Sequence, residues 1–157
     1  MNKEKIFLAS SISGFSDENT YRKYREKVLG FIKYLRNNSF DVYSEIERVT
    51  GKSNYDSPEQ SVNEDFRKID NSDIFLLLHP QKMQTSALIE LGYAYAQKKT
   101  IIIISSLSAL PYLALGLPSA NAKVRIINSS DLNEEIFATT ITTINNCKDF
   151  IESEIYK

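Results

Sequence analysis

The sequence predicts an α/β protein with three α/β/α layers, in which a five-stranded parallel sheet lies between two layers of helices. Two observations support this fold class. Five short apolar segments alternate with segments of helical periodicity. Three of these segments are continuously apolar, as expected for strands that are covered on both faces of a parallel sheet. The predicted strands are residues 6–9, 40–43, 74–78, 101–104 and 124–127.

The first predicted helix lies between the first two strands. Ser16 and Asp17 are candidates for its N-cap, because their side-chain oxygens can accept a hydrogen bond from the first helical turn. Apolar side chains then recur at intervals of three and four residues, which indicates one buried helix face. They are Tyr21, Tyr24, Val28, Phe31, Ile32 and Leu35.

The second predicted helix has the clearest start. Ser57 suits the N-cap, Pro58 the first helical position and Gln60 the third, which together form a capping box. The predicted buried face of this helix consists of Val62, Phe66 and Ile69.

Two further helices are expected over residues 85–97 and from residue 132 to the C-terminus. Right-handed crossovers between parallel strands then favour the flavodoxin-like, Rossmann-like strand order 2-1-3-4-5. In that arrangement a ligand binds at the carboxyl ends of strands 1 and 3. No internal repeat or interdomain linker is apparent, so residues 1–157 are expected to form a single domain.

Composition excludes several classes of function. The 157 residues include 19 basic and 20 acidic side chains, a net charge of −1, which gives no excess positive charge for binding a nucleic acid polymer. The single cysteine and single histidine exclude a structural zinc site of the usual composition. No secretory leader is apparent at the N-terminus, so a cytoplasmic location is expected.

An uncharged stretch between Lys99 and Lys123 is long enough to span a bilayer. It contains Pro111, Pro118 and Asn121, so we interpret it as a strand followed by an apolar loop or short helix and expect no membrane span. Residues 107–117 are nevertheless too apolar to lie freely in water. We expect them to cover a binding pocket or to form the contact of a homo-oligomer.

Small hydroxyl side chains follow the first predicted strand, where a ligand would bind. Ser10, Ser11, Ser13 and Gly14 form a turn whose backbone N–H groups and hydroxyls suit a phosphate or a sugar hydroxyl. A simple strand-to-helix connection is the alternative interpretation. His79, at the end of the third strand, is a candidate contact to a base, or else an ordinary loop histidine.

Two carboxylates lie on the predicted helices beside this position. Glu90 stands among apolar residues, although a helix dipole alone would favour a carboxylate in an early helical turn. A capping box would require Ser or Thr at position 87, which is Ala87. Asp65 lies at the shoulder of the second helix's apolar face, where a solvated side chain is the alternative.

These residues resemble a known family. The run Glu90-Leu91-Gly92-Tyr93-Ala94, together with Asp65 and the turn after the first strand, resembles the nucleoside 2-deoxyribosyltransferase superfamily over about residues 5–105. The resemblance implies that Glu90 is the nucleophile on C1′ and that Asp65 contacts the sugar or assists the leaving base. Ser11 and Gly14 are the nearest matches to the family's substrate-holding loop. The implied double displacement requires no metal, nucleotide cofactor or histidine.

The sequence also departs from the family's pattern. Phe7 stands where many members have a tyrosine that orients the nucleophile, which leaves room for a ribose 2′-hydroxyl. Ser13 replaces a basic residue, which weakens the case for a 5′-phosphate, and Gln84 replaces an acid that recognises the base. Ser86 begins a bulkier approach to the glutamate than the family's glycine-rich one.

The predicted partner is therefore a small nucleoside or nucleotide, and the predicted activity is cleavage or transfer of its N-glycosidic bond. Two alternatives remain open. One is a catalytically inactive module that binds or senses a nucleotide derivative. The other is a TIR-like domain that cleaves NAD at a glycosidic bond, which the Glu90–Ala94 run disfavours.

Overall fold

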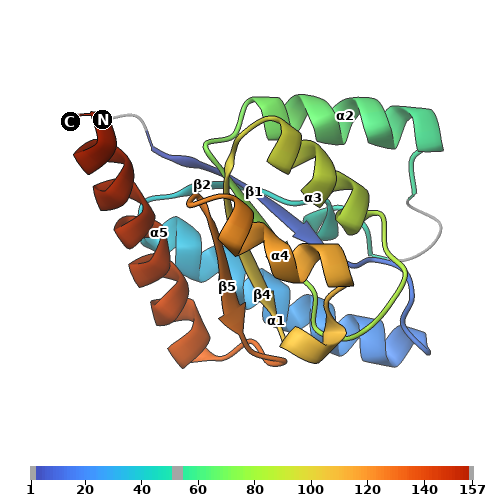
Figure 1. The fold of residues 1–157 in the computed structure, drawn as a ribbon. Coiled ribbons are helices and arrows are strands. Elements are labelled where there is room, and N and C mark those ends of the chain that lie inside the picture. The colour runs from blue at the N-terminus through green and yellow to red at the C-terminus, as the bar shows by residue number, and fades with distance from the viewer. Residues whose placement is uncertain (1–2, 51–54, 156–157) are drawn as a thin grey trace.

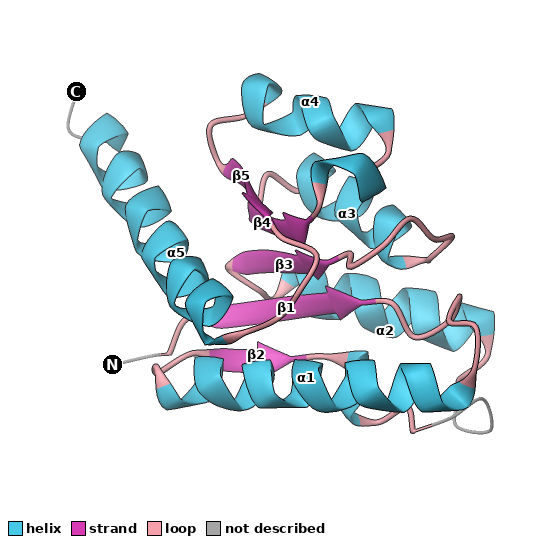
Figure 2. Cartoon of the chain, turned by 90° about the horizontal axis from the view of Figure 1, so that it is seen from below, coloured by secondary structure: helices cyan, strands magenta, loops and turns pink. Residues whose placement is uncertain are grey.

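The computed structural model describes residues 3–50 and 55–155. Its strands form one parallel sheet in the order β2-β1-β3-β4-β5, which confirms the predicted fold class and strand order. Figure 2 shows the strands running in the same direction between the helices. The strands are β1 (Lys5–Ser10), β2 (Asp41–Tyr43), β3 (Ile74–Leu78), β4 (Thr100–Ser105) and β5 (Val124–Asn128).

Helices cover both faces of the sheet, so the molecule has three layers (Figure 1). One face packs against α1 and α5, and the other packs against α2, α3 and α4. The helices are α1 (Glu18–Asn37), α2 (Pro58–Asp70), α3 (Ala87–Ala96), α4 (Tyr112–Ala120) and α5 (Glu134–Ile155). Short 3-10 helices lie at Glu45–Glu47 and Leu107–Ala109.

Alternation along β1 divides its side chains between the two cores. Ile6 and Leu8 belong to the core under α1 and α5, whereas Phe7 and Ala9 belong to the core under α2, α3 and α4. Successive side chains of a strand point to opposite faces, so this division follows from the strand geometry. Position 7 therefore faces the same side of the sheet as the two helices that carry the candidate carboxylates.

The helix starts follow the predicted caps. Asp17 accepts a hydrogen bond from the Thr20 backbone N–H at 2.8 Å and caps α1. Ser57 and Gln60 form the predicted capping box at the start of α2. The buried face predicted for α2 is only partly correct, because Val62 is 50% exposed. This part of α2 borders a pocket, where no neighbouring side chain covers it.

The uncharged stretch after Lys99 forms β4, a 3-10 helix and α4, as the interpretation of a strand followed by a short helix predicts. Within the described residues, no helix combines the length and apolar character needed to cross a bilayer. The segment is only half buried. Leu110 and Ala114 pack into the core, but Tyr112 and Leu113 are 89% and 82% exposed.

Candidate active site

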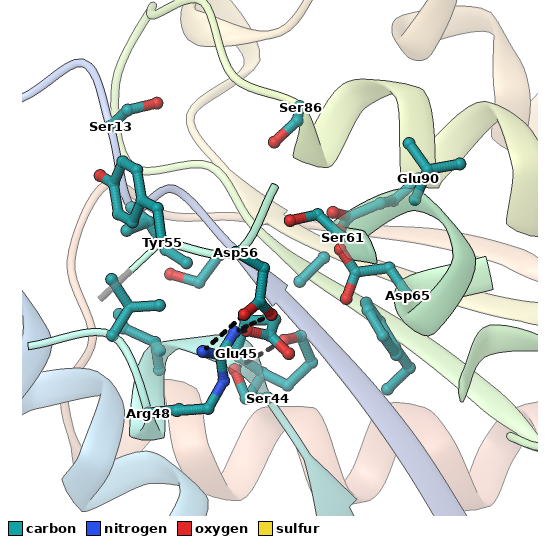
Figure 3. A pocket seen from close by; sticks show the side chains of 18 of the residues that line it. Ser13, Ser44, Glu45, Arg48, Tyr55, Asp56, Ser61, Asp65, Ser86 and Glu90 are labelled. Atoms are coloured by element: carbon teal, nitrogen blue, oxygen red, sulfur yellow. Dashed lines mark hydrogen bonds and ion pairs between the residues drawn. The ribbon is translucent and has the colours of Figure 1, made fainter. Parts of the chain in front are cut away.

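A pocket of about 340 Å³ lies at the carboxyl end of β1, beside α2 and α3. Four parts of the chain meet there, as Figure 3 shows: the end of β1, the 3-10 helix after β2, the first turns of α2 and the start of α3. The predicted position at the carboxyl edge of the sheet is therefore occupied by a cavity of a size that suits a small ligand.

Asp65 and Glu90 both line this pocket, although they come from different helices. Asp65 lies in the middle of α2 and is 9% exposed, because this side of α2 faces the sheet. Glu90 lies in the first turn of α3, where its backbone N–H donates to the Ser86 carbonyl. Parallel strands bring the start of α3 beside α2, so the two carboxyl groups face one cavity (Figure 3).

Burial and mutual repulsion raise the pKa of both carboxyl groups. Burial, with the negative charges of Glu45 and Glu64, raises the pKa of Asp65 to about 7. Burial, with the charges of Asp65 and Glu45 and a hydrogen bond to Asp65, raises the pKa of Glu90 to about 8. Asp65 Oδ1 is buried without a hydrogen-bond partner among the described residues. The pair thus carries one shared proton near neutral pH and retains an acceptor for a further partner.

A third carboxylate, Glu45, lines the same pocket and was not predicted. Its carboxylate accepts hydrogen bonds from the Tyr43 hydroxyl and from the Arg48 guanidinium. Arg48 also donates to Asp56, with Nη2 2.7 Å from Asp56 Oδ2. Ser44 donates to the Leu8 carbonyl of β1 at 2.8 Å and ties this corner to the neighbouring strand.

One observation in the sequence could have identified this corner. The predicted order placed strand 2 next to strand 1, so the residues after strand 2 also reach the carboxyl edge of the sheet. Ser44, Glu45 and Arg48 follow that strand directly. Asp56, which precedes the second helix, also lines the pocket.

Phe7 lines the pocket and is held in an aromatic cluster. Its ring stacks on Phe75 of β3, with centroids 5.8 Å apart, and packs against Tyr43 of β2 at 5.5 Å. Phe7 pairs with Tyr43 in the register of β1 and β2. A tyrosine hydroxyl is therefore present beside position 7, but it donates to Glu45.

The other predicted site residues divide into two groups. Ser10, Ser13 and Ser86 line the pocket, although the Ser10 hydroxyl is hydrogen-bonded to the Tyr24 hydroxyl at 2.8 Å. Ser11 and Gly14 do not line it. Ser11 follows the last residue of β1 and is fully buried.

Gly14 instead lies against the loop before α3. It has a φ of +93°, a conformation that favours glycine, and a β-carbon there would lie 3.3 Å from the Gln84 carbonyl oxygen. Its observed contact is thus with the protein backbone.

His79 and Gln84 line a second pocket of about 540 Å³, between the β3–α3 loop and the segment before α4. His79 is buried because β3 ends beneath that segment, and burial lowers its pKa. We call the pocket that Asp65 and Glu90 line the carboxylate pocket. The structure places none of four predicted residues on it, namely Ser11, Gly14, His79 and Gln84. Their roles in substrate binding stay predictions.

The apolar segment 107–117 does not cover the carboxylate pocket, because none of its residues lines that cavity. The expectation that this segment folds over the site is wrong for the single chain. Its side chains pack instead beside α3 and border the second pocket. The other expectation, a homo-oligomer contact, stays a prediction.

Comparison with known proteins agrees with the class of protein that this fold and pocket define. The model of the family described as "Nucleoside 2-deoxyribosyltransferase like" matches residues 3–106, more than half of the chain, and the chain belongs to this family. A comparison with curated protein sequences finds no match.

Three solved structures are similar in fold. The CMP N-glycosidase BcmB of Clostridium botulinum matches with a TM-score of 0.67 and 20% identity, over 88% of this chain and 99% of BcmB. BlsM matches with a TM-score of 0.70 and 18% identity, over 99% and 96% of the two chains. A conserved protein from Enterococcus faecalis V583 matches with a TM-score of 0.60 and 19% identity, over 87% and 96%.

Proposed function

We propose that the protein cleaves or transfers the N-glycosidic bond of a nucleoside or nucleotide through a covalent intermediate on Glu90. The observation that supports this function best is the Asp65–Glu90 pair, two carboxyl groups from different helices that face one pocket and hold one proton between them near neutral pH. Membership in the deoxyribosyltransferase-like family supports the same reaction class.

In the first step the pair reacts in the form that has the shared proton on Asp65, and the Glu90 carboxylate attacks C1′ of the sugar while the bond from C1′ to the base nitrogen breaks. The electron pair of that bond leaves with the base, and Asp65 supplies the proton that neutralises it. The transition state resembles an oxocarbenium ion, whose positive charge the surrounding carboxylates stabilise. The products are the free base and a glycosyl ester of Glu90.

In the second step water attacks C1′ of the ester and releases Glu90 as a carboxylate. The deprotonated Asp65 accepts a proton from the attacking water, which restores the starting protonation of the pair. A second base in place of water gives a new nucleoside by the same route. The choice between hydrolysis and transfer depends on which acceptor occupies the space that the first base vacates.

Substitution Glu90→Gln tests the proposal. Glutamine keeps the shape of the side chain but cannot act as a carboxylate nucleophile, so we expect base release to fall by at least about a thousandfold. The assay incubates protein with nucleosides, nucleotides and NAD and measures free base by chromatography. Glu135→Gln, an exposed position on α5, is the matched control and should keep wild-type activity.

Three results would decide between this proposal and its alternatives. Wild-type turnover by Glu90→Gln would exclude Glu90 as the nucleophile. Binding of nucleosides without any base release by the wild-type protein would support the inactive binding module. Cleavage of NAD alone would support the TIR-like activity.

A further inference from the structure

The charged side chains that line the pocket affect an uncharged nucleoside and a negatively charged nucleotide differently. Four carboxyl groups line it, from Glu45, Asp56, Asp65 and Glu90. Arg48 is the one lysine or arginine among the described residues of the lining. Even with one proton shared by Asp65 and Glu90, the negative charges of these described residues exceed the positive charges.

Arg48 is already engaged by two of these carboxylates. Its Nη2 atom lies 2.5 Å from Glu45 Oε2 and 2.7 Å from Asp56 Oδ2. Glu45 is held in place further by the Tyr43 hydroxyl (Figure 3 shows the Arg48 contacts). The guanidinium charge is therefore balanced within the protein, and an incoming phosphate would have to compete with two fixed carboxylates for it.

The backbone of the corner that carries these groups is also fixed. The Arg25 guanidinium of α1 donates to the Ile46 carbonyl at 2.9 Å and to the Glu47 carbonyl at 2.8 Å. A shift of the backbone that carries Glu45 and Arg48 would break these bonds. The backbone of this corner is thus tied to α1.

The other polar groups of the lining are neutral. The start of α3 attracts negative charge, but Glu90 lies in its first turn and is the anion nearest to that helix end. Uncharged hydroxyls offer both donors and acceptors, which suit sugar hydroxyls and a base. They belong to Ser10, Ser13, Ser44, Tyr55, Ser61 and Ser86.

We propose that this site takes uncharged nucleosides in preference to their 5′-monophosphates, and that Glu45 and Asp56 set this preference. The inference rests on the proposed function and specifies its substrate class. A phosphate dianion entering this pocket meets repulsion that a free 5′-hydroxyl does not. The preference differs from the nucleotide specificity that the name of the CMP N-glycosidase BcmB states for that protein.

The test compares kcat/KM for ribo- and deoxynucleosides with that for their 5′-monophosphates, measured as released base. We expect the wild-type protein to prefer nucleosides at least about tenfold, and to lose much of this preference between 0.05 and 0.5 M salt, roughly the range over which screening becomes strong. Equal or faster release from the monophosphates would overturn the inference while leaving the proposed function intact.

A double variant tests the two residues. Glu45→Gln with Asp56→Asn removes two negative charges beside Arg48, so the preference for nucleosides should narrow at least about fivefold. The matched control, Asp131→Asn with Glu135→Gln, removes two exposed carboxylates outside the pocket and should leave the preference unchanged. An unchanged preference in the pocket variant would exclude these residues as its cause. If that variant does not fold, the salt dependence of the wild-type preference tests whether the preference is electrostatic.

Binding separates this inference from the proposed function. If no base is released from any substrate, isothermal titration calorimetry with cytidine and adenosine and with their 5′-monophosphates replaces the kinetic assay. Tighter binding of the nucleosides would support the inferred preference although the proposed reaction has failed. Tighter binding of the monophosphates, or binding of neither class, would overturn it.

Discussion

The pocket that holds Asp65 and Glu90 and the second pocket, which holds His79, both lie at the carboxyl edge of the sheet. Burial shifts the pKa of their titratable groups in opposite directions. Each borders a buried side chain with an atom that lacks a partner within the described part of the chain, Asp65 Oδ1 in one and His79 Nδ1 in the other. Burial raises the pKa of Asp65 to about 7 and lowers the pKa of His79. In both groups burial favours the uncharged form.

The difference lies in their neighbours. Asp65 has Glu90 beside it, a second carboxyl group with which it shares a proton. Within the described part of the chain, the His79 ring is hydrogen-bonded to the backbone of Ala109, which accepts the bond and cannot exchange a proton with the ring. Burial of a single group such as His79 thus favours its uncharged form and provides no second group for proton exchange. Burial of a coupled pair such as Asp65 and Glu90 provides an acid and a base at the same pH.

Removing the acid of the pair should give the largest effect in this comparison. Asp65→Asn removes the group that we propose protonates the departing base, so we expect base release to fall by roughly 10² to 10⁴. Glu59→Gln, exposed in the first turn of the same helix, is the matched control. Activity within threefold of wild type would show that Asp65 is not the acid.

The same pair predicts the pH dependence of the wild-type protein. Below about pH 7 both carboxyl groups are protonated and the nucleophile is lost, and above about pH 8 both are ionised and the acid is lost. The rate should therefore pass through a maximum between these values. Asp65→Asn should abolish the fall at high pH, which a purely structural role of Asp65 would not do.

Folding stability should respond to the same charges. Glu90 has a pKa raised from 4.5 to about 8 in the folded protein, so the folded state binds the proton more tightly than the unfolded state and loses stability as pH rises through this window. Glu90→Gln has no such proton to lose. We expect it to match wild type at pH 4 and to exceed it at pH 9 by on the order of 2–4 kcal/mol.

Urea denaturation of both proteins at the two pH values measures this difference. Glu135→Gln should show no comparable dependence, because its carboxylate is exposed. A constant difference between Glu90→Gln and wild type across this range would contradict the burial of a charged group at position 90.

A smaller effect is expected at Phe7. Phe7→Tyr adds a hydroxyl where the family's tyrosine orients the nucleophile, and a hydrogen bond to a charged group contributes ~1.5–3 kcal/mol at most. On the proposed role of Phe7, the added hydroxyl would also occupy the space expected for a ribose 2′-hydroxyl. We expect the ratio of activity on deoxyribo- over ribonucleosides to rise by up to about tenfold, measured as kcat/KM on matched pairs such as deoxycytidine and cytidine.

The matched control is Tyr43→Phe, which removes the hydroxyl that the neighbouring strand already provides to Glu45. It should not raise the preference for deoxyribonucleosides. If Phe7→Tyr leaves the ratio unchanged, the departure at position 7 does not set sugar specificity.

The second pocket should give the smallest effect. Gln84→Ala changes an exposed side chain that does not line the carboxylate pocket, so base release should stay within about twofold of wild type for every base. Ser86→Ala changes a side chain that lines the carboxylate pocket, and we expect it to change KM more than Gln84→Ala does. A change of base preference in Gln84→Ala would support the sequence-based prediction that Gln84 recognises the base.

The sequence by itself determined the fold, because the pattern that specifies it is local. Continuous apolar runs such as residues 74–78, and a capping box such as Ser57 with Gln60, need only neighbouring residues to be interpreted. The run beginning at Glu90 likewise indicated the family without any tertiary contact. The carboxyl edge of the sheet followed from the predicted strand order.

Only the tertiary structure decided which side chains meet at that edge. Glu45 and Arg48 reach the pocket from the segment after β2, whereas Asp56 precedes α2, which packs beside α3. The same packing buries Asp65, for which periodicity favoured solvent. The raised pKa values of the pair depend on this burial and on charges from other elements, so no local pattern contains them.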